Sequence, residues 1–129
     1  MPVLVDTSVW IDLFRGNATE PVATLKALLG LEELLLGDLI LAEILQGVRD
    51  AREAHRVDRA FRAYTVVPLV GEAIARKSAA HYRELRRQGI TVRKTIDCLI
   101  AAWCIEHTVP LLHDDRDFHP FVSRGLIEA

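Results

Sequence analysis

The sequence predicts an α/β domain in which helices cover both faces of a mainly parallel sheet. Short apolar segments alternate along the chain with longer amphipathic segments, and neighbouring parallel strands need a crossover connection that is usually a helix. The chain has 129 residues, of which 50% are hydrophobic and 26% are charged, as in ordinary globular domains. Because the sequence contains no linker, internal repeat or low-complexity tract, residues 1–129 are expected to form a single domain.

Four short apolar segments have the length and composition of buried strands. The first is Val3–Val5, which stops abruptly at Asp6. The other three are Leu34–Leu36, "TVVPL" at 65–69 and "VPLLH" at 109–113. We expect these four segments to lie in one sheet.

Six longer segments show the helical spacing of apolar residues or the residues that cap helices. The first helix is expected to have Thr7 or Ser8 as its cap and to end near Gly16. The last, "TIDCLIAAWCIEH" at 95–107, is almost wholly apolar after its first turn and is therefore expected to be central. The four helices between them are expected at 21–30, 37–47, 50–64 and 72–88.

Charge and hydropathy limit the partners and the location of the protein. Sixteen basic and eighteen acidic residues give a net charge of −2, so no overall positive field attracts nucleic acid, although a polyanionic substrate is not excluded. The apolar stretches are too short to cross a bilayer and the N-terminus does not resemble a signal peptide, so a cytoplasmic protein is expected. Cys98 and Cys104 lie on separate faces of one predicted helix, which favours core packing over a disulfide.

Acidic residues follow the first and the last predicted strands. Asp6 comes directly after the first strand, and Asp115 and Asp117 follow the last one. Since ligands of open α/β sheets bind beyond the carboxyl ends of the strands, these side chains are candidates for one site. Asp97 lies in the first turn of the apolar helix, where free backbone N–H groups favour an anion.

Glu43 is a further candidate because it lies mid-helix in "LAEILQG", where a buried carboxylate needs a cation, a proton or a path to water. Taken singly, each acid has a simpler explanation as a helix cap, a solvated side chain or a loop residue. Together they would repel one another unless a cation neutralised them, and ligands that are all oxygen suit Mg²⁺ or Mn²⁺. His113 and His119 have no obvious partner pair for zinc, so surface or supporting roles are expected for them.

A divalent cation held by carboxylates is suited to phosphate chemistry, because it activates water and offsets charge on a phosphodiester. Arg93 and Lys94 precede Asp97 and are candidates for binding neighbouring phosphates, with solvated surface charge as the alternative. A phosphatase of the haloacid dehalogenase type is a weaker alternative. Such a site wants a second Asp two residues after Asp6 or a lysine after a late strand, and the sequence has neither.

Four stretches, "VLVDTSVWIDLFRG", "LAEILQG", "TIDCLIAAWCIEH" and "LLHDDRDF", occur in the order and at the spacing of a known family. The chain resembles PIN-domain ribonucleases, specifically the VapC-type toxins of bacterial toxin–antitoxin pairs. This resemblance implies a three-layer α/β/α sandwich and a Mg²⁺- or Mn²⁺-dependent endoribonuclease that cleaves tRNA or another structured RNA. It also implies a small VapB-type antitoxin and a homodimer.

The resemblance assigns site residues as well. It carries the catalytic metal ligands over to Asp6, Glu43, Asp97 and Asp115, with Asp117 as a nearby fifth ligand. A hydroxyl of Thr7 or Ser8 would support a ligand or a water in the substrate site. The chain departs from the family at His113 and Asp114, where a Thr or Ser followed by Asn is common, and this departure affects metal affinity and pH profile. A non-catalytic PIN module is the alternative, but such modules typically lack one or more of the acids that this chain retains.

Apolar side chains indicate where an antitoxin would bind. Trp10, Leu13 and Phe14 follow the first strand, and stripes at 25–29 and 54–64 offer further apolar faces. If these faces exceed what one small sheet covers, an amphipathic antitoxin helix can lie in a groove between such helices and direct a basic residue at the acids. The alternative is that all these side chains belong to the core.

Overall fold

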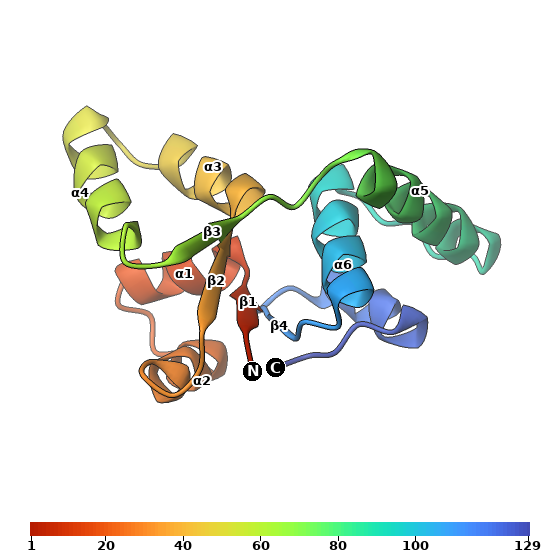
Figure 1. Ribbon diagram of the computed structural model, residues 1–129, viewed down its shortest axis with the longest axis horizontal. Helices are drawn as coiled ribbons and strands as arrows, with labels where there is room; N and C mark the ends of the chain where they lie inside the picture. Colours follow the sequence, from red (N-terminus) through yellow and green to blue (C-terminus); the bar gives the residue numbers. More distant parts are fainter.

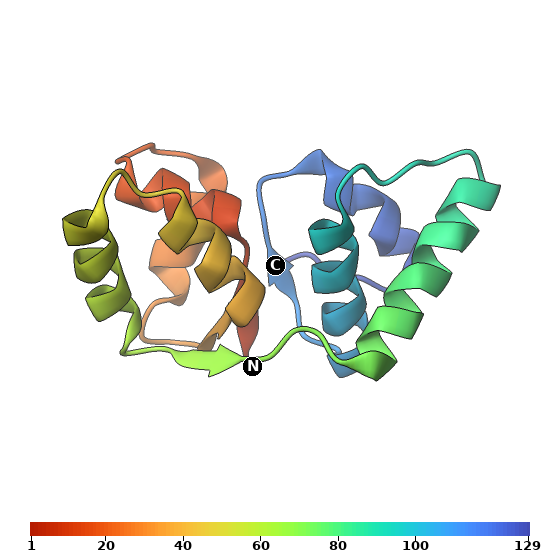
Figure 2. The same ribbon diagram turned by 90° about the horizontal axis from the view of Figure 1, so that it is seen from above.

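The computed structural model describes all 129 residues and has three layers, with a four-stranded parallel sheet between two groups of helices (Figures 1 and 2). The order of the strands across the sheet is β3-β2-β1-β4, and every neighbouring pair is parallel. The α/β class, the sheet type and the positions of the four strands are therefore confirmed. The strands are β1 (Val3–Val5), β2 (Leu34–Gly37), β3 (Thr65–Val67) and β4 (Leu111–Leu112).

Two strands are shorter than the sequence predicts, and prolines lie at their limits. β3 ends before Pro68 and β4 begins after Pro110, in agreement with the missing N–H group that keeps proline out of a sheet ladder. The central strand β1 pairs on both sides, with Leu4 opposite Leu35 in β2 and Leu111 in β4. The carboxyl ends of β1 and β4 consequently lie next to each other.

Six α-helices occupy the segments predicted for them. Helices α1 to α4 lie on one side of the sheet, and α5 and α6 lie on the other (Figure 2). A 3-10 helix, η1 (Arg116–Arg124), contacts α5 and α6, and the sequence pattern does not predict it. The helices are α1 (Thr7–Phe14), α2 (Glu20–Leu28), α3 (Asp38–Gln46), α4 (Ala51–Phe61), α5 (Glu72–Arg87) and α6 (Thr95–His107).

The hydrophobic core runs through both helical layers. Helix α6 is buried along much of its length, as predicted, and its two cysteines, Cys98 and Cys104, are free and buried. On the other face of the sheet, Trp10 packs edge-on against Phe61, with ring centroids 5.0 Å apart. Much of the apolar stripe at 54–64 therefore belongs to the core rather than to a free surface.

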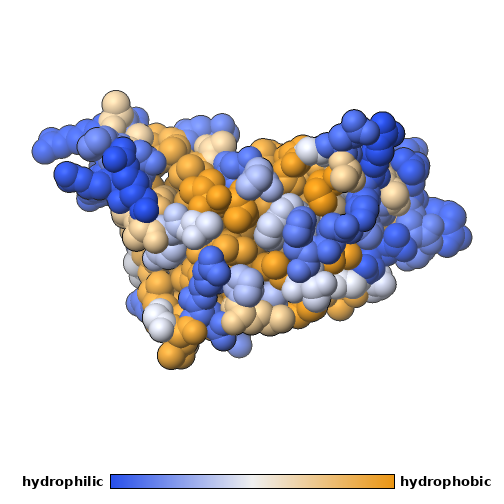
Figure 3. Space-filling view, in the orientation of Figure 1, coloured by the Kyte–Doolittle hydropathy of each residue, from blue (hydrophilic) through white to orange (hydrophobic).

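The surface is hydrophilic at the two ends of the molecule, over α4 and α5 (Figure 3). Apolar side chains are exposed beyond the end of α2, where Leu29 and Leu31 are 43% and 79% accessible. None of the helices combines the length and the apolar character that a membrane span requires.

Candidate metal centre

The sheet brings the acidic residues of β1 and β4 to one edge. Asp6 follows β1, and its backbone N–H donates a hydrogen bond of 2.9 Å to the carbonyl of Leu112 in β4. Asp115 lies three residues beyond Leu112 and caps η1. Asp97, Asp115 and Asp117 each present a carboxylate oxygen, and these three atoms lie within 4.8 Å of one another.

Asp6 is buried and is itself the N-cap of α1, which corrects the expectation that Thr7 or Ser8 would cap this helix. The Ser8 hydroxyl donates to Asp6 Oδ2 over 2.8 Å, and the Ser8 amide donates to the same oxygen over 3.3 Å. Burial raises the pKa of Asp6 and outweighs these hydrogen bonds, which act in the opposite direction. Ser8 thus fixes the orientation of the Asp6 carboxylate.

Asp97 is the least satisfied of the acids. It lies in the first turn of α6, 6% exposed, and its buried Oδ2 atom has no hydrogen-bond partner. Burial, together with the negative charges of Asp6, Asp115 and Glu43, raises its pKa to about 7, while Lys94 acts in the opposite direction. A cation at this position would supply the missing partner for Oδ2 and would keep the carboxylate ionised.

Glu43 is half-buried on α3, and a residue of the neighbouring helix α1 forms a hydrogen bond with its carboxylate. The Thr7 hydroxyl donates to Glu43 Oε1 over 2.9 Å. Glu43 also raises the pKa of Asp97 by its charge, so its carboxylate acts electrostatically on the same site. Thr7 and Ser8, adjacent in sequence, therefore orient two different carboxylates.

Asp117 lies at the rim of the acidic group, where it meets a basic residue. Its backbone N–H donates to Asp115 Oδ1 over 2.9 Å, and its own Oδ1 atom lies 3.4 Å from Arg93 Nη2. The Arg93 side chain is 73% exposed, so this ion pair is weak. Lys94, at the N-cap of α6, is near enough to lower the pKa of Asp97.

The donor set fits a hard divalent cation. All the side chains that converge are carboxylates, which suit Mg²⁺ or Mn²⁺ better than zinc. The unpartnered Oδ2 of Asp97 and the raised pKa values of Asp6 and Asp97 are the costs expected when such a group folds without a cation. A cation bound here would lie at the strand-end edge of an α/β sheet, the usual place for a ligand in this class of fold.

Comparison with known proteins gives the family. Residues 3–121 match the model of the PIN domain. Ribonuclease VapC11 from Mycobacterium tuberculosis is 33% identical over 118 residues, which cover 90% of this chain and 88% of that protein. The chain belongs to the VapC ribonucleases of the PIN domain family. The recognition from sequence is therefore confirmed, and the phosphatase alternative is wrong.

Solved structures share the fold of this PIN domain. VapBC2 from Rickettsia felis, solved with a DNA fragment from its promoter, aligns with a TM-score of 0.78 at 16% identity, covering 100% of this chain and 98% of that one. A toxin–antitoxin complex from Klebsiella pneumoniae aligns with a TM-score of 0.69 at 22% identity, covering 90% and 89% of the two chains. These likenesses confirm the three-layer architecture.

The His113 ring forms its hydrogen bonds with the Asp115 backbone and with Glu128, and with none of the carboxylates proposed as metal ligands. Its Nδ1 atom accepts a hydrogen bond of 3.2 Å from the Asp115 amide, and its Nε2 atom lies 2.6 Å from Glu128 Oε2. The amide of Asp114 donates to the Ser8 hydroxyl over 3.3 Å, which links the β4 loop to α1. Sequence reasoning missed Glu128, since no spacing pattern connects it to His113.

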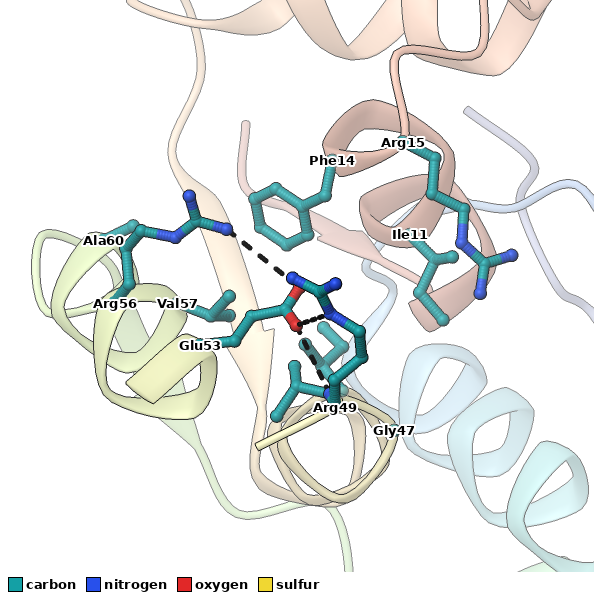
Figure 4. A pocket seen from close by; sticks show the side chains of 11 residues that line it. Ile11, Phe14, Arg15, Gly47, Arg49, Glu53, Arg56, Val57 and Ala60 are labelled. Carbon is teal, nitrogen blue, oxygen red and sulfur yellow. Dashed lines mark hydrogen bonds and ion pairs between the residues drawn. The ribbon is translucent and has the colours of Figure 1, made fainter. Parts of the chain in front are cut away.

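A groove lies between α1, α3 and α4 (Figure 4). Its volume is about 510 Å³. Apolar side chains of all three helices line it, among them Phe14 from α1 and Val57 from α4. At its rim Arg49 Nε donates to Glu53 Oε2 over 3.1 Å. Two of these helices, α1 and α4, carry the apolar faces that the sequence predicts at Trp10–Phe14 and at 54–64.

Proposed function

We propose that this chain is an endoribonuclease that needs Mg²⁺ or Mn²⁺, with residues 1–129 forming one catalytic domain. The catalytic metal ligands in this proposal are Asp6, Glu43, Asp97 and Asp115, and Asp117 is an additional ligand. The observation that carries it is the buried, unpartnered Oδ2 atom of Asp97 among other carboxylates. The name of the 33% identical relative is that of a ribonuclease, and this chain has all the acids of the proposed ligand set.

Hydrogen bonds from neighbouring side chains and from one backbone amide orient the acids for a cation. Ser8 orients Asp6, Thr7 orients Glu43, and the Asp117 amide orients Asp115. Such supporting hydrogen bonds fix the direction of ligand oxygens and raise metal affinity. Bound there, Mg²⁺ or Mn²⁺ would offset charge on the phosphodiester and lower the pKa of an attacking water.

The basic residues at the rim are proposed to position the RNA. Arg93 would exchange its exposed ion pair with Asp117 for a phosphate, and Lys94 would bind a neighbouring phosphate. Single-stranded loops of a structured RNA such as tRNA fit an open edge of this kind, because unpaired bases can reach it. An RNA substrate also agrees with action in the cytoplasm.

Cleavage assays with single substitutions test this function. Untagged protein and an end-labelled tRNA are incubated with Mg²⁺ or Mn²⁺, and with EDTA as the metal-free control. Asp97→Asn should lower the cleavage rate by roughly 100-fold or more, because it removes a ligand charge. Asp117→Asn should have a smaller effect, and Asp58→Asn, on the remote helix α4, should have none. Metal-dependent cleavage by Asp97→Asn at the parent rate would refute the assignment, and a parent that binds metal and RNA without cleaving would be the non-catalytic module.

A small antitoxin is proposed to occupy the groove between α1, α3 and α4. The structural neighbours include a toxin–antitoxin complex, and the groove has an apolar floor with charged side chains at its rim, which suits an amphipathic helix. Ala60→Glu on α4 should prevent co-purification with the antitoxin that we expect to be encoded beside the gene, and it should leave ribonuclease activity intact. Light scattering of the free chain tests the homodimer that we also propose.

A further inference from the structure

We propose that His113, His119 and Glu128 form a second metal site, separate from the carboxylate centre and suited to a transition-metal ion such as Zn²⁺. One ligand atom from each residue lies within 4.8 Å of the other two. The three residues come from the segment after β4, from η1 and from the C-terminal tail. The sequence gives His113 and His119 no third ligand, and the fold supplies one in Glu128.

The distances show how closely the three ligand atoms converge. His113 Nε2 lies 2.6 Å and His119 Nδ1 lies 3.0 Å from the same atom, Glu128 Oε2. A tetrahedral ion with bonds of about 2.0–2.2 Å holds its ligand atoms about 3.4 Å apart. With an ion bound, Glu128 Oε2 would therefore lie about 0.8 Å farther from His113 Nε2 and about 0.4 Å farther from His119 Nδ1. The Glu128 side chain is 34% exposed, so it can move toward solvent by this amount.

The backbone already holds the three ligands in place. The C-terminal tail adds to the sheet edge through a parallel bridge between Leu111 and Glu128, and the Ala129 amide donates to the Leu111 carbonyl over 3.0 Å. The His113 ring is buried and lies against Phe118, with centroids 4.9 Å apart. The exposed His119 side chain and the Glu128 carboxylate have room to adjust. Because the His113 ring and the backbone of Glu128 are already fixed, binding an ion costs little conformational entropy.

The ligand types select a different ion from the carboxylate centre. Two imidazole nitrogens and one carboxylate oxygen are a common ligand set of zinc, with a fourth position left for water, whereas Mg²⁺ prefers oxygen ligands alone. The exposure of His119 leaves that fourth position on the solvent side. In the alternative role, the two His–Glu pairs only hold the C-terminal segment, residues 125–129, against β4. Zn²⁺ binding distinguishes a metal site from this structural role.

Metal binding has one further structural consequence. In the metal-free protein His113 Nδ1 accepts from the Asp115 amide, so the ring proton is on Nε2, which donates to Glu128. An ion that binds Nε2 displaces the proton from that nitrogen, and the neutral ring then takes up a proton on Nδ1. Nδ1 can no longer accept the hydrogen bond from the Asp115 amide, which is lost. In protein saturated with Mg²⁺, the NMR resonance of the Asp115 amide should therefore shift again when Zn²⁺ is added, and the loss of this shift in Glu128→Gln assigns it to the second site.

Calorimetric titration of untagged protein with Zn²⁺, in excess Mg²⁺ to occupy the carboxylate centre, tests the proposal. The parent should bind one Zn²⁺ per chain. In a parallel NMR titration, its Asp115 amide resonance should shift. His119→Gln and Glu128→Gln should each weaken binding by more than about tenfold, since even loss of a supporting group costs that much. His55→Gln, an exposed histidine on α4, is the matched control and should bind as the parent does.

Two further results decide the outcome. Asp97→Asn should retain Zn²⁺ binding even though it loses metal-dependent cleavage, so failure of the ribonuclease proposal and failure of this one are distinguishable. A parent that binds no Zn²⁺, or variants His119→Gln and Glu128→Gln that bind it as tightly as the parent, would overturn the second site. In either case the only role of the cluster would be to hold the C-terminal segment against β4. Thermal unfolding followed by circular dichroism verifies that both variants are folded.

Discussion

Asp97, a proposed metal ligand, affects the stability of the metal-free protein. Its pKa of about 7 lies well above the ordinary value of 3.8, first because it is buried and then because other carboxylates surround it. Between these two pH values the folded protein binds more protons than the unfolded chain. The stability linked to this group is therefore present below about pH 4 and is lost as the pH rises through about 7.

Replacing Asp97 should remove that loss. In metal-free buffer, Asp97→Asn should have nearly the same free energy of unfolding as the parent near pH 4. It should be more stable by about 1 to 2 kcal/mol near pH 8, once solvent screening is allowed for. Urea unfolding at the two pH values measures the difference. If the two proteins differed in free energy of unfolding by the same amount at both pH values, the ionisation of Asp97 would not be the cause of the difference.

Thr7 allows a second test at the scale of one hydrogen bond. Thr7→Val keeps the shape of the side chain and removes the donor to Glu43 Oε1. Metal-dependent RNA cleavage should fall by roughly 10- to 100-fold, as for other residues that orient ligands. Thr7→Ser, which keeps the hydroxyl, should restore most of the rate. Equal rates for the valine and serine variants would show that the hydroxyl does not matter.

At the scale of elements, the strands and helices follow from local patterns, and their limits follow from caps and prolines. The six α-helices match segments of helical spacing, yet the cap of α1 is Asp6 rather than a hydroxyl residue. The sequence cannot show which of Asp6, Thr7 and Ser8 is the N-cap, because Asp, Ser and Thr are all good caps. Helix η1 has Pro120 within it and follows a three-residue repeat, so the search for a 3.6-residue period passes over it.

The junction of β2 and α3 depends on close approach at Gly37. A Cβ atom there would lie 2.3 Å from Leu69 Cδ1 and 2.9 Å from Leu69 Cγ, and Leu69 is fully buried. Gly37→Ala should therefore lower the free energy of unfolding by roughly 1–3 kcal/mol through overpacking. Chemical denaturation measures the loss, and adding Leu69→Ala to the variant should relieve the clash. If Gly37→Ala alone were as stable as the parent, Leu69 would be able to move aside at no cost in free energy.

At the scale of the whole molecule, the site is assembled from both ends and the middle of the chain. Sequence alone could place Asp6 and Asp115 at strand ends through the parallel-sheet rule, and it could single out Glu43 as a carboxylate in an apolar helix. The family resemblance supplied the expectation that Glu43 is a metal ligand. The contact between Arg93 and Asp117 and the approach of Glu128 to His113 and His119 depend on tertiary packing. Local sequence patterns do not encode such contacts. Arg93 and Asp117 are 24 positions apart, and His113 and Glu128 are 15 positions apart.

Metal binding should stabilise the whole domain because the acids converge only in the folded state. Mg²⁺ at about ten times its dissociation constant should add about 1.4 kcal/mol to the free energy of unfolding. For a domain of this size that raises Tm by a few degrees. Differential scanning calorimetry across a magnesium titration measures the rise, which should be smaller for Asp97→Asn and unchanged for Asp58→Asn. If Tm stayed constant in the parent while Mg²⁺ still supported cleavage, the ion would be held chiefly by the RNA, and the carboxylates would act on it only in the complex.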